Sequence, residues 1–82
     1  MKVTLQPVQS SNIASVGHEE NTLVVKFKNG TVYTYDGVSA AEMENLVSAS
    51  SIGKHFICNI KGQYAYKRHS QYFENGDELE IF

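Results

Sequence analysis

The side chains of this sequence that are best suited to contact a ligand lie between residues 51 and 68, where cations stand beside tyrosines and no acid occurs. Lysine and arginine bind phosphate oxygens, and aromatic rings stack on bases, so this combination is typical of nucleic-acid contacts. A solvated helix face followed by a turn is the competing interpretation of the same charges. His69 is a further ring that could stack on a base. The predicted nucleic-acid-binding residues are Lys54, Lys61, Tyr64, Tyr66, Lys67 and Arg68.

Charge is distributed unevenly along the chain, although the formal net charge is only -2. Residues 45 to 73 hold four cations and no acid, whereas residues 74 to 82 hold four acids and no base. The basic segment indicates a polyanionic partner, while the slightly acidic total argues against strong, indiscriminate DNA binding. Pairing within the chain is the main competing use of the cations, and the acids available for it are Glu74, Asp77, Glu78 and Glu80.

Metal binding and catalysis are not predicted. His55 and Cys58 are three residues apart, but His18 and His69 are isolated, so no second pair stands at metal-ligand spacing. No neighbouring base is placed to activate the Cys58 thiol. The acids fall on turns, a helix cap and the tail, where they form no acid and base pair. We therefore expect a non-enzymatic protein with no catalytic residue, no metal and no cofactor.

The length of 82 residues fits one small domain, residues 1 to 82, with an acidic C-terminal tail over 74 to 82. The single cysteine excludes an internal disulfide. No apolar run approaches the ~20 residues that span a bilayer, and the N-terminus lacks a signal-peptide core. We expect a cytoplasmic protein without membrane contact.

Residues 22 to 35 give the clearest local signal, because two β-rich runs flank Asn29-Gly30 and predict a hairpin. A two-residue loop would place Phe27 opposite Val32 and would set the hairpin tyrosines beside Lys26. A three-residue loop, with Gly30 as a left-handed bulge, would place Phe27 opposite Thr31. The longer loop is favoured because it gathers the apolar residues on one face. That face would carry Leu23, Val25, Phe27, Tyr33 and Tyr35, and the other Val24, Lys26, Val32 and Thr34.

The two tyrosines of this hairpin, Tyr33 and Tyr35, have two interpretations. They could form a platform on which bases stack. The favoured interpretation is that their rings pack beneath the helices with the hydroxyls at the rim.

Helix signals follow the hairpin. Ser39 and Glu42 have the spacing of a capping box and begin a predicted helix over about 39 to 48. A second helix is predicted over about 51 to 61, with Gly62 as its C-terminal glycine. The side chains of this helix that recur every four residues form its core stripe, namely Ile52, Phe56 and Ile60.

The start of the second helix also has two interpretations. Free amides beside Ser50, Ser51, Gly53 and Lys54 could bind a phosphate. Ordinary capping by a serine, with a close-packed glycine, is favoured because the pattern is not that of a phosphate-binding loop.

The remaining segments complete a small α+β domain, in which an antiparallel sheet of three to four strands around the 22 to 35 hairpin is covered by the two helices. Residues 13 to 17 form a strand, and residues 3 to 8 an edge strand or an extended lead-in. Residues 73 to 76 resemble a turn, and residues 77 to 82 a short terminal strand or an ordered tail.

Several motifs between residues 10 and 68 together resemble one known family. They are Ser10-Ser11-Asn12-Ile13, Leu23-x-Val25-x-Phe27-x-x-Gly30-x-x-Tyr33-x-Tyr35-x-Gly37-Val38, Leu46 to Ala49, and Ser51-x-Gly53-Lys54-x-Phe56-x-x-x-Ile60-x-Gly62-x-Tyr64-x-Tyr66. On these residues the chain resembles the KTSC domain family. That family is named for the C-terminal extension of certain lysyl-tRNA synthetases and is also found as small stand-alone bacterial and phage proteins.

Two positions depart from the family pattern. Ala65 stands where proline is usual, and His18 where an aromatic is common. The resemblance implies no established activity, and its attachment to a tRNA-handling enzyme suggests RNA binding. We therefore expect a weak nucleic-acid-binding module, with RNA or another single-stranded nucleic acid as partner. The alternative is a protein-interaction module, such as a phage or accessory protein whose acidic tail docks on a host protein.

Overall fold

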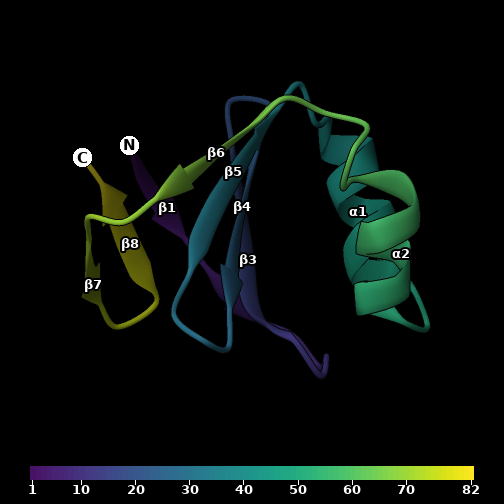
Figure 1. The fold of residues 1–82 in the computed structure, drawn as a ribbon, viewed down its shortest axis with the longest axis horizontal. Coiled ribbons are helices and arrows are strands. Elements are labelled where there is room, and N and C mark those ends of the chain that lie inside the picture. Colours follow the sequence, from purple (N-terminus) through teal and green to yellow (C-terminus); the bar gives the residue numbers. More distant parts are fainter.

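Three layers make up the computed structural model, which describes all residues from 1 to 82: two helices, a five-stranded sheet and a three-stranded sheet (Figure 1). The α+β class is confirmed, but the expectation of a single sheet of three to four strands is wrong. The strands of the five-stranded sheet lie in the order β2 (Gln6–Pro7), β3 (Ile13–Glu19), β4 (Thr22–Phe27), β5 (Val32–Asp36) and β6 (Tyr66–His69). The strands of the three-stranded sheet lie in the order β1 (Lys2–Thr4), β8 (Glu78–Ile81) and β7 (Tyr72–Asn75). The helices are α1 (Ala40–Ser48) and α2 (Ile52–Asn59).

The hairpin of β4 and β5 has the favoured register, with Val25 opposite Tyr33. The Phe27 amide donates to the Thr31 carbonyl at 2.8 Å, and the Gly30 amide donates to the Phe27 carbonyl at 2.9 Å. Gly30 has a φ of +90°, the left-handed conformation that this bulged turn requires. The two-residue loop is therefore wrong.

Both helices begin at caps predicted from the sequence. The Ser39 hydroxyl accepts from the Glu42 amide at 3.1 Å, and the Ser51 hydroxyl accepts from the Lys54 amide at 3.3 Å. The Glu42 carboxylate does not return to the Ser39 amide as a full capping box would require. It lies 3.2 Å from Nε2 of His55 and so links α1 to α2. Neither helix has the length and apolar content needed to cross a membrane.

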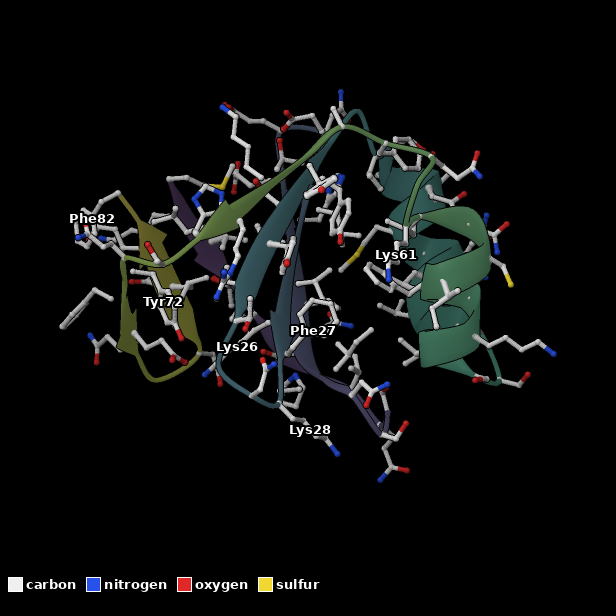
Figure 2. All side chains as sticks on the ribbon, in the orientation of Figure 1. Lys26, Phe27, Lys28, Lys61, Tyr72 and Phe82 are labelled. Atoms are coloured by element: carbon white, nitrogen blue, oxygen red, sulfur yellow. The ribbon has the colours of Figure 1, made fainter.

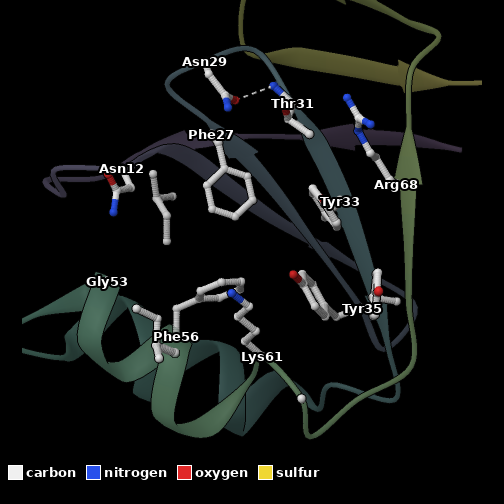
Figure 3. Close-up of a pocket in the computed structure, with 14 residues that line it drawn as sticks. Asn12, Phe27, Asn29, Thr31, Tyr33, Tyr35, Gly53, Phe56, Lys61 and Arg68 are labelled. Atoms are coloured by element: carbon white, nitrogen blue, oxygen red, sulfur yellow. Dashed lines mark hydrogen bonds between the residues drawn. The ribbon is translucent and has the colours of Figure 1, made fainter.

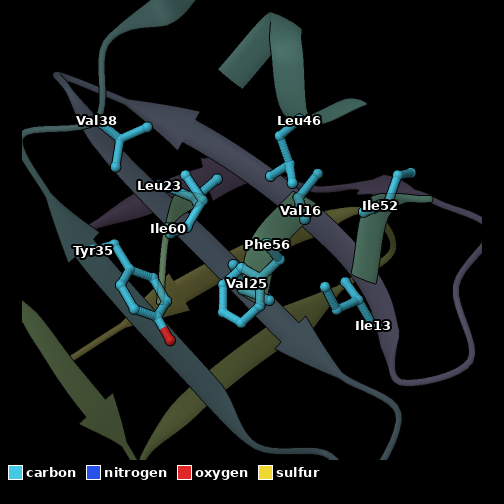
Figure 4. Packing of buried hydrophobic residues seen from close by; sticks show 10 residues of the cluster. All are labelled: Ile13, Val16, Leu23, Val25, Tyr35, Val38, Leu46, Ile52, Phe56 and Ile60. Atoms are coloured by element: carbon cyan, nitrogen blue, oxygen red, sulfur yellow. The ribbon is translucent and has the colours of Figure 1, made fainter. Parts of the chain in front are cut away.

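The helices cover one face of the five-stranded sheet (Figure 1). Figure 4 shows side chains of both layers meeting there, with Leu46 from α1 and Phe56 from α2 against Val16 of β3 and Val25 of β4. The predicted stripe of the second helix is buried as expected. The buried residues of this core are Ile13, Val16, Leu23, Val25, Tyr35, Val38, Leu46, Ile52, Phe56 and Ile60.

The opposite face of the five-stranded sheet is also buried. Val24 and Val32 are fully buried there, beneath Leu79 and Ile81 of the three-stranded sheet. β1 and β2 are separated only by Leu5, so the N-terminal strand segment passes from one sheet into the other. A second core therefore lies where the sequence suggested only the outer face of a hairpin.

The C-terminal residues belong to this second layer. Residues 73 to 76 are not simply a turn, since 73 to 75 lie in β7, which pairs with β8 and is followed by Gly76 at a φ of +65°. β8 is the central strand of its sheet, and the buried Leu79 and Ile81 anchor it. Of the two alternatives for residues 77 to 82, a short terminal strand or an ordered tail, the structure contains the strand. The turn was misassigned because β7 is mostly exposed and becomes a strand through pairing with β8.

Gly17 lies where β3 and β1 of the two sheets approach each other closely. A Cβ atom at this position would lie 2.7 Å from the Thr4 carbonyl oxygen and 2.8 Å from Cγ2 of Val3. The first of these neighbours is backbone, which cannot move aside without shifting β1. Glycine is therefore required here by the lack of space.

Gly17→Ala is expected to lower the free energy of unfolding by about 1 to 3 kcal/mol, since overpacking at this contact must displace β1. Gly53→Ala is the matched control, because the same methyl group would meet only the Ser10 hydroxyl, at 3.3 Å. Urea denaturation followed by circular dichroism measures both. Equal stabilities of Gly17→Ala and the unchanged protein would contradict the close approach.

Candidate nucleic-acid interface

Five aromatic rings form a continuous wall between the five-stranded sheet and α2. Phe27 contacts Phe56 edge to face, with ring centroids 5.8 Å apart, and Phe56 contacts Tyr35 in the same way at 5.4 Å. Tyr33 stacks on Tyr35 at 6.3 Å, and Tyr66 of β6 lies 5.9 Å from Tyr33. Edge-to-face and offset arrangements are the favourable ones for aromatic pairs. The wall thus joins the helix to the edge of the sheet.

The tyrosines of this wall combine packing with a free polar group. The rings of Tyr33 and Tyr35 do pack beneath the helices, as the favoured interpretation held. Tyr72 is the one tyrosine whose hydroxyl donates to a protein group. No buried side-chain oxygen or nitrogen lacks a partner, so the Tyr35 hydroxyl oxygen is reached by solvent. Burial of the ring is the main cause that raises the pKa of Tyr35 to about 12, and the neighbouring Tyr33 and Tyr66 hydroxyls raise it further by charge repulsion.

The wall lines a cavity of about 610 Å³ (Figure 3). Cavities of this size are typical of small-ligand sites. Lys61 and Arg68 are the only charged residues in its lining, and neither forms a salt bridge. The amides of Asn12 and Asn29 line the end near the hairpin loop. The cavity is therefore aromatic, supplied with cations and free of carboxylates.

Lys61 reaches the cavity because α2 ends just before it. The helix stops at Asn59, two residues before the predicted end, and the Lys61 amide donates to the Phe56 carbonyl at 2.9 Å. Gly62 follows with a φ of +83°, the C-terminal glycine predicted from the sequence. Figure 3 shows the Lys61 side chain extending from this turn toward the rings.

Tyr66 and Arg68 reach the cavity from β6. Alternate residues of a strand share a face, and β6 pairs Tyr66 with Tyr35 and Arg68 with Tyr33. Both side chains therefore lie on the face that the helices cover in part. Tyr66 remains 63% exposed because β6 is the edge of its sheet.

The other three predicted contact residues lie elsewhere. Lys67 points to the opposite face of β6, opposite Thr34. Lys54, on the first turn of α2, lines a separate small depression with Ser10 and Ser51. Tyr64 is half-buried and packs against the helix-side core. The structure thus gathers Lys61, Tyr66 and Arg68 and separates them from the rest.

His69, the further ring suggested for stacking, shares the face of Lys67. Its Nε2 lies 2.9 Å from the Thr34 hydroxyl, and burial, reinforced by Lys67 and opposed by Asp36, lowers the pKa of His69. The ring is partly buried on the face of β6 that the helices do not cover. It does not line the cavity.

The acids of the C-terminal segment do not cover the basic residues. Glu74 binds the Lys26 ammonium through both carboxylate oxygens, at 2.6 and 2.7 Å, and Glu78 lies 4.0 Å from Lys2. Figure 2 places Lys26 and Tyr72 near the three-stranded sheet, while Lys61 lies beside the helices. Pairing of the tail acids with the cations of residues 54 to 68, the competing use of those charges, is therefore not found.

Sequence reasoning missed several residues of the cavity. The sequence placed Phe27 and Phe56 in the core alone and Asn29 in the hairpin loop, and it gave Asn12 no role beyond a family motif. No local signal places Asn12 beside the hairpin loop. That placement follows from the Lys28 amide, which donates to the Asn12 carbonyl at 2.8 Å.

The fold and the cavity define a class: a small α+β domain with an aromatic, cation-bearing cavity between sheet and helix. The chain belongs to the KTSC domain family, whose pattern it matches over residues 9 to 64. An uncharacterised protein of Stutzerimonas stutzeri is 38% identical over 64 residues, which cover 74% of this chain and 90% of that protein. The crystal structure of a KTSC domain protein from Yersinia pestis superposes with a TM-score of 0.75 and 36% identity, covering 80% of this chain and 96% of that one.

The Tyr35 hydroxyl is expected to stay protonated well into the alkaline range. Because its pKa in the folded protein lies above the ordinary tyrosine value of 10, its contribution to stability is present below pH 10 and is lost as the pH rises toward 12. The absorbance change at about 295 nm between about pH 9 and pH 10.5 should therefore be nearly the same in Tyr35→Phe as in the unchanged protein. A clearly smaller change in Tyr35→Phe would show that this hydroxyl ionises normally.

Proposed function

We propose that this domain is a non-enzymatic module that binds single-stranded nucleic acid, with RNA as its natural partner, in the cavity between α2 and strands β5 and β6. The observation that carries the proposal is one cavity that combines an aromatic wall with two unpaired cations and has no carboxylate in its lining. Proteins that bind single strands combine these two elements, aromatic stacking surfaces and cations along the backbone. RNA is favoured over DNA because the family resemblance implies attachment of such domains to a tRNA-handling enzyme.

Each contact residue has a proposed role. Tyr66 is the exposed ring on which a base stacks, and Arg68 and Lys61 contact the phosphates. Arginine offers a planar fork that can engage two phosphate oxygens, whereas lysine acts as a point charge. Two phosphate contacts make binding weak and dependent on salt. Lys54 and Lys67, which lie outside the cavity, contribute little to it.

A protein partner is the second candidate. Phe73 and Phe82 are 58% and 78% exposed, and both lie outside the residues that match the family. A docking surface would then be the side of the three-stranded sheet, because Leu79 and Ile81 hold the acidic segment in place. Capture of one stoichiometric protein, unaffected by nuclease, would favour this candidate.

Removing the cavity contacts should weaken RNA binding more than removing cations outside it. Tyr66→Ala is expected to cost about 1 to 3 kcal/mol in binding a single-stranded RNA oligomer, the value of one stacked base. Lys61→Ala and Arg68→Ala should each reduce the slope of log affinity against log salt by about 0.7. Fluorescence anisotropy over a salt series measures both effects.

Lys54→Ala and Lys67→Ala are the matched controls, because they remove the same charge from other surfaces. Both should bind RNA with nearly unchanged affinity. An equal loss for Lys67→Ala and Lys61→Ala would mean that only net charge matters, and RNA binding unaffected by Tyr66→Ala and Arg68→Ala would place the contact surface outside the cavity.

A further inference from the structure

The cations of the basic segment do not form a track along which a strand could run. Lys61 and Arg68 line the cavity, Lys54 lines a separate depression, and Lys67 lies on the other face of β6. A strand of several nucleotides needs a continuous positive groove to follow its backbone. In this chain two cations share a surface at one place only, the cavity lined by Lys61 and Arg68.

The aromatic wall is also limited to one place. Its five rings lie with neighbouring centroids 5.4 to 6.3 Å apart and so form a single cluster. The other two aromatic residues with large exposure, Phe73 and Phe82, belong to the three-stranded sheet and its end. No second stacking surface continues the first, so a second base would leave the cavity.

The polar groups of the cavity are mostly hydrogen-bond donors. Lys61 and Arg68 are two of these donors, and the NH₂ group of Asn29 is a third. The side-chain oxygen of Asn29 accepts from the Thr31 amide at 3.0 Å, which leaves the NH₂ group for other partners. Asn12 lines the same end. With no carboxylate present, the lining suits a ligand that has an anionic group and a planar ring carrying acceptor atoms.

We infer that the cavity binds a single nucleotide unit, with its base on the aromatic wall and its phosphate held by Arg68, while Lys61 supplies a second positive charge on the helix side of the cavity. This inference rests on the proposed nucleic-acid binding and limits its footprint. The amides of Asn12 and Asn29 are placed to contact the edge of the base. A single nucleotide is then a sufficient ligand, and a longer strand adds no contacts of its own.

The test is a nuclear magnetic resonance titration of the full chain with the four ribonucleoside 5′-monophosphates, the matching nucleosides, and a ten-residue single-stranded RNA. The monophosphates should shift the amide signals of the cavity residues and bind within about threefold of the oligomer, counted per nucleotide. The nucleosides, which lack the phosphate, should bind at least about tenfold more weakly. Arg68→Ala should remove most of this difference, whereas Lys67→Ala should keep it.

The other results separate this inference from the proposed function. An oligomer that binds in the cavity when no monophosphate does, or whose affinity per nucleotide rises steeply with length, overturns the single-nucleotide footprint and leaves RNA binding in place. If neither the oligomer nor any monophosphate shifts the cavity signals, both the single-nucleotide inference and the proposed nucleic-acid binding are wrong. Nucleosides that bind as well as monophosphates overturn the role of Lys61 and Arg68.

Discussion

Burial of both faces of strand β4 is the constraint on which the rest of the structure depends. Leu23, Val24 and Val25 are consecutive and all fully buried, although successive residues of a strand point to opposite faces. Such a strand needs a covering layer on each side. The helices provide one through Leu46 and Phe56, and the three-stranded sheet provides the other.

The position of the cavity follows from this layering. The five-stranded sheet ends at β6, whose residues Tyr66, Lys67 and Arg68 are all exposed. Phe56 contacts the ring of Tyr35, and Tyr33 and Tyr66 continue this row of rings toward the edge strand, where Tyr66 is exposed. The aromatic residues that build the core are thus continuous with those that line the cavity. A role in folding and a role in binding need not exclude each other for the same ring.

Local rules explain what the sequence predicted well, and distance along the chain explains what it did not. The hairpin register, the caps at Ser39 and Ser51 and the glycine after α2 depend on residues within a few positions of one another. The second sheet depends on pairing of β1 with β8, at opposite ends of the chain. The division of the cations depends on where α2 stops and on which face of β6 each side chain takes. Neither the ion pair of Lys26 with Glu74, 48 residues apart, nor the place of Asn12 has a local signal.

The separation of charge between layers reconciles an acidic chain with an anion-binding cavity. Near a protein surface a unit charge pair about 4 Å apart interacts by about 4 kcal/mol, and salt screens exposed charges beyond about 10 Å. Nearby carboxylates therefore matter far more than the net charge of -2. Glu74 is held at Lys26, on the other side of the five-stranded sheet from Lys61. Glu74, which is positioned in β7 by pairing with β8 and is bound to Lys26, thus lies away from the cations of the cavity.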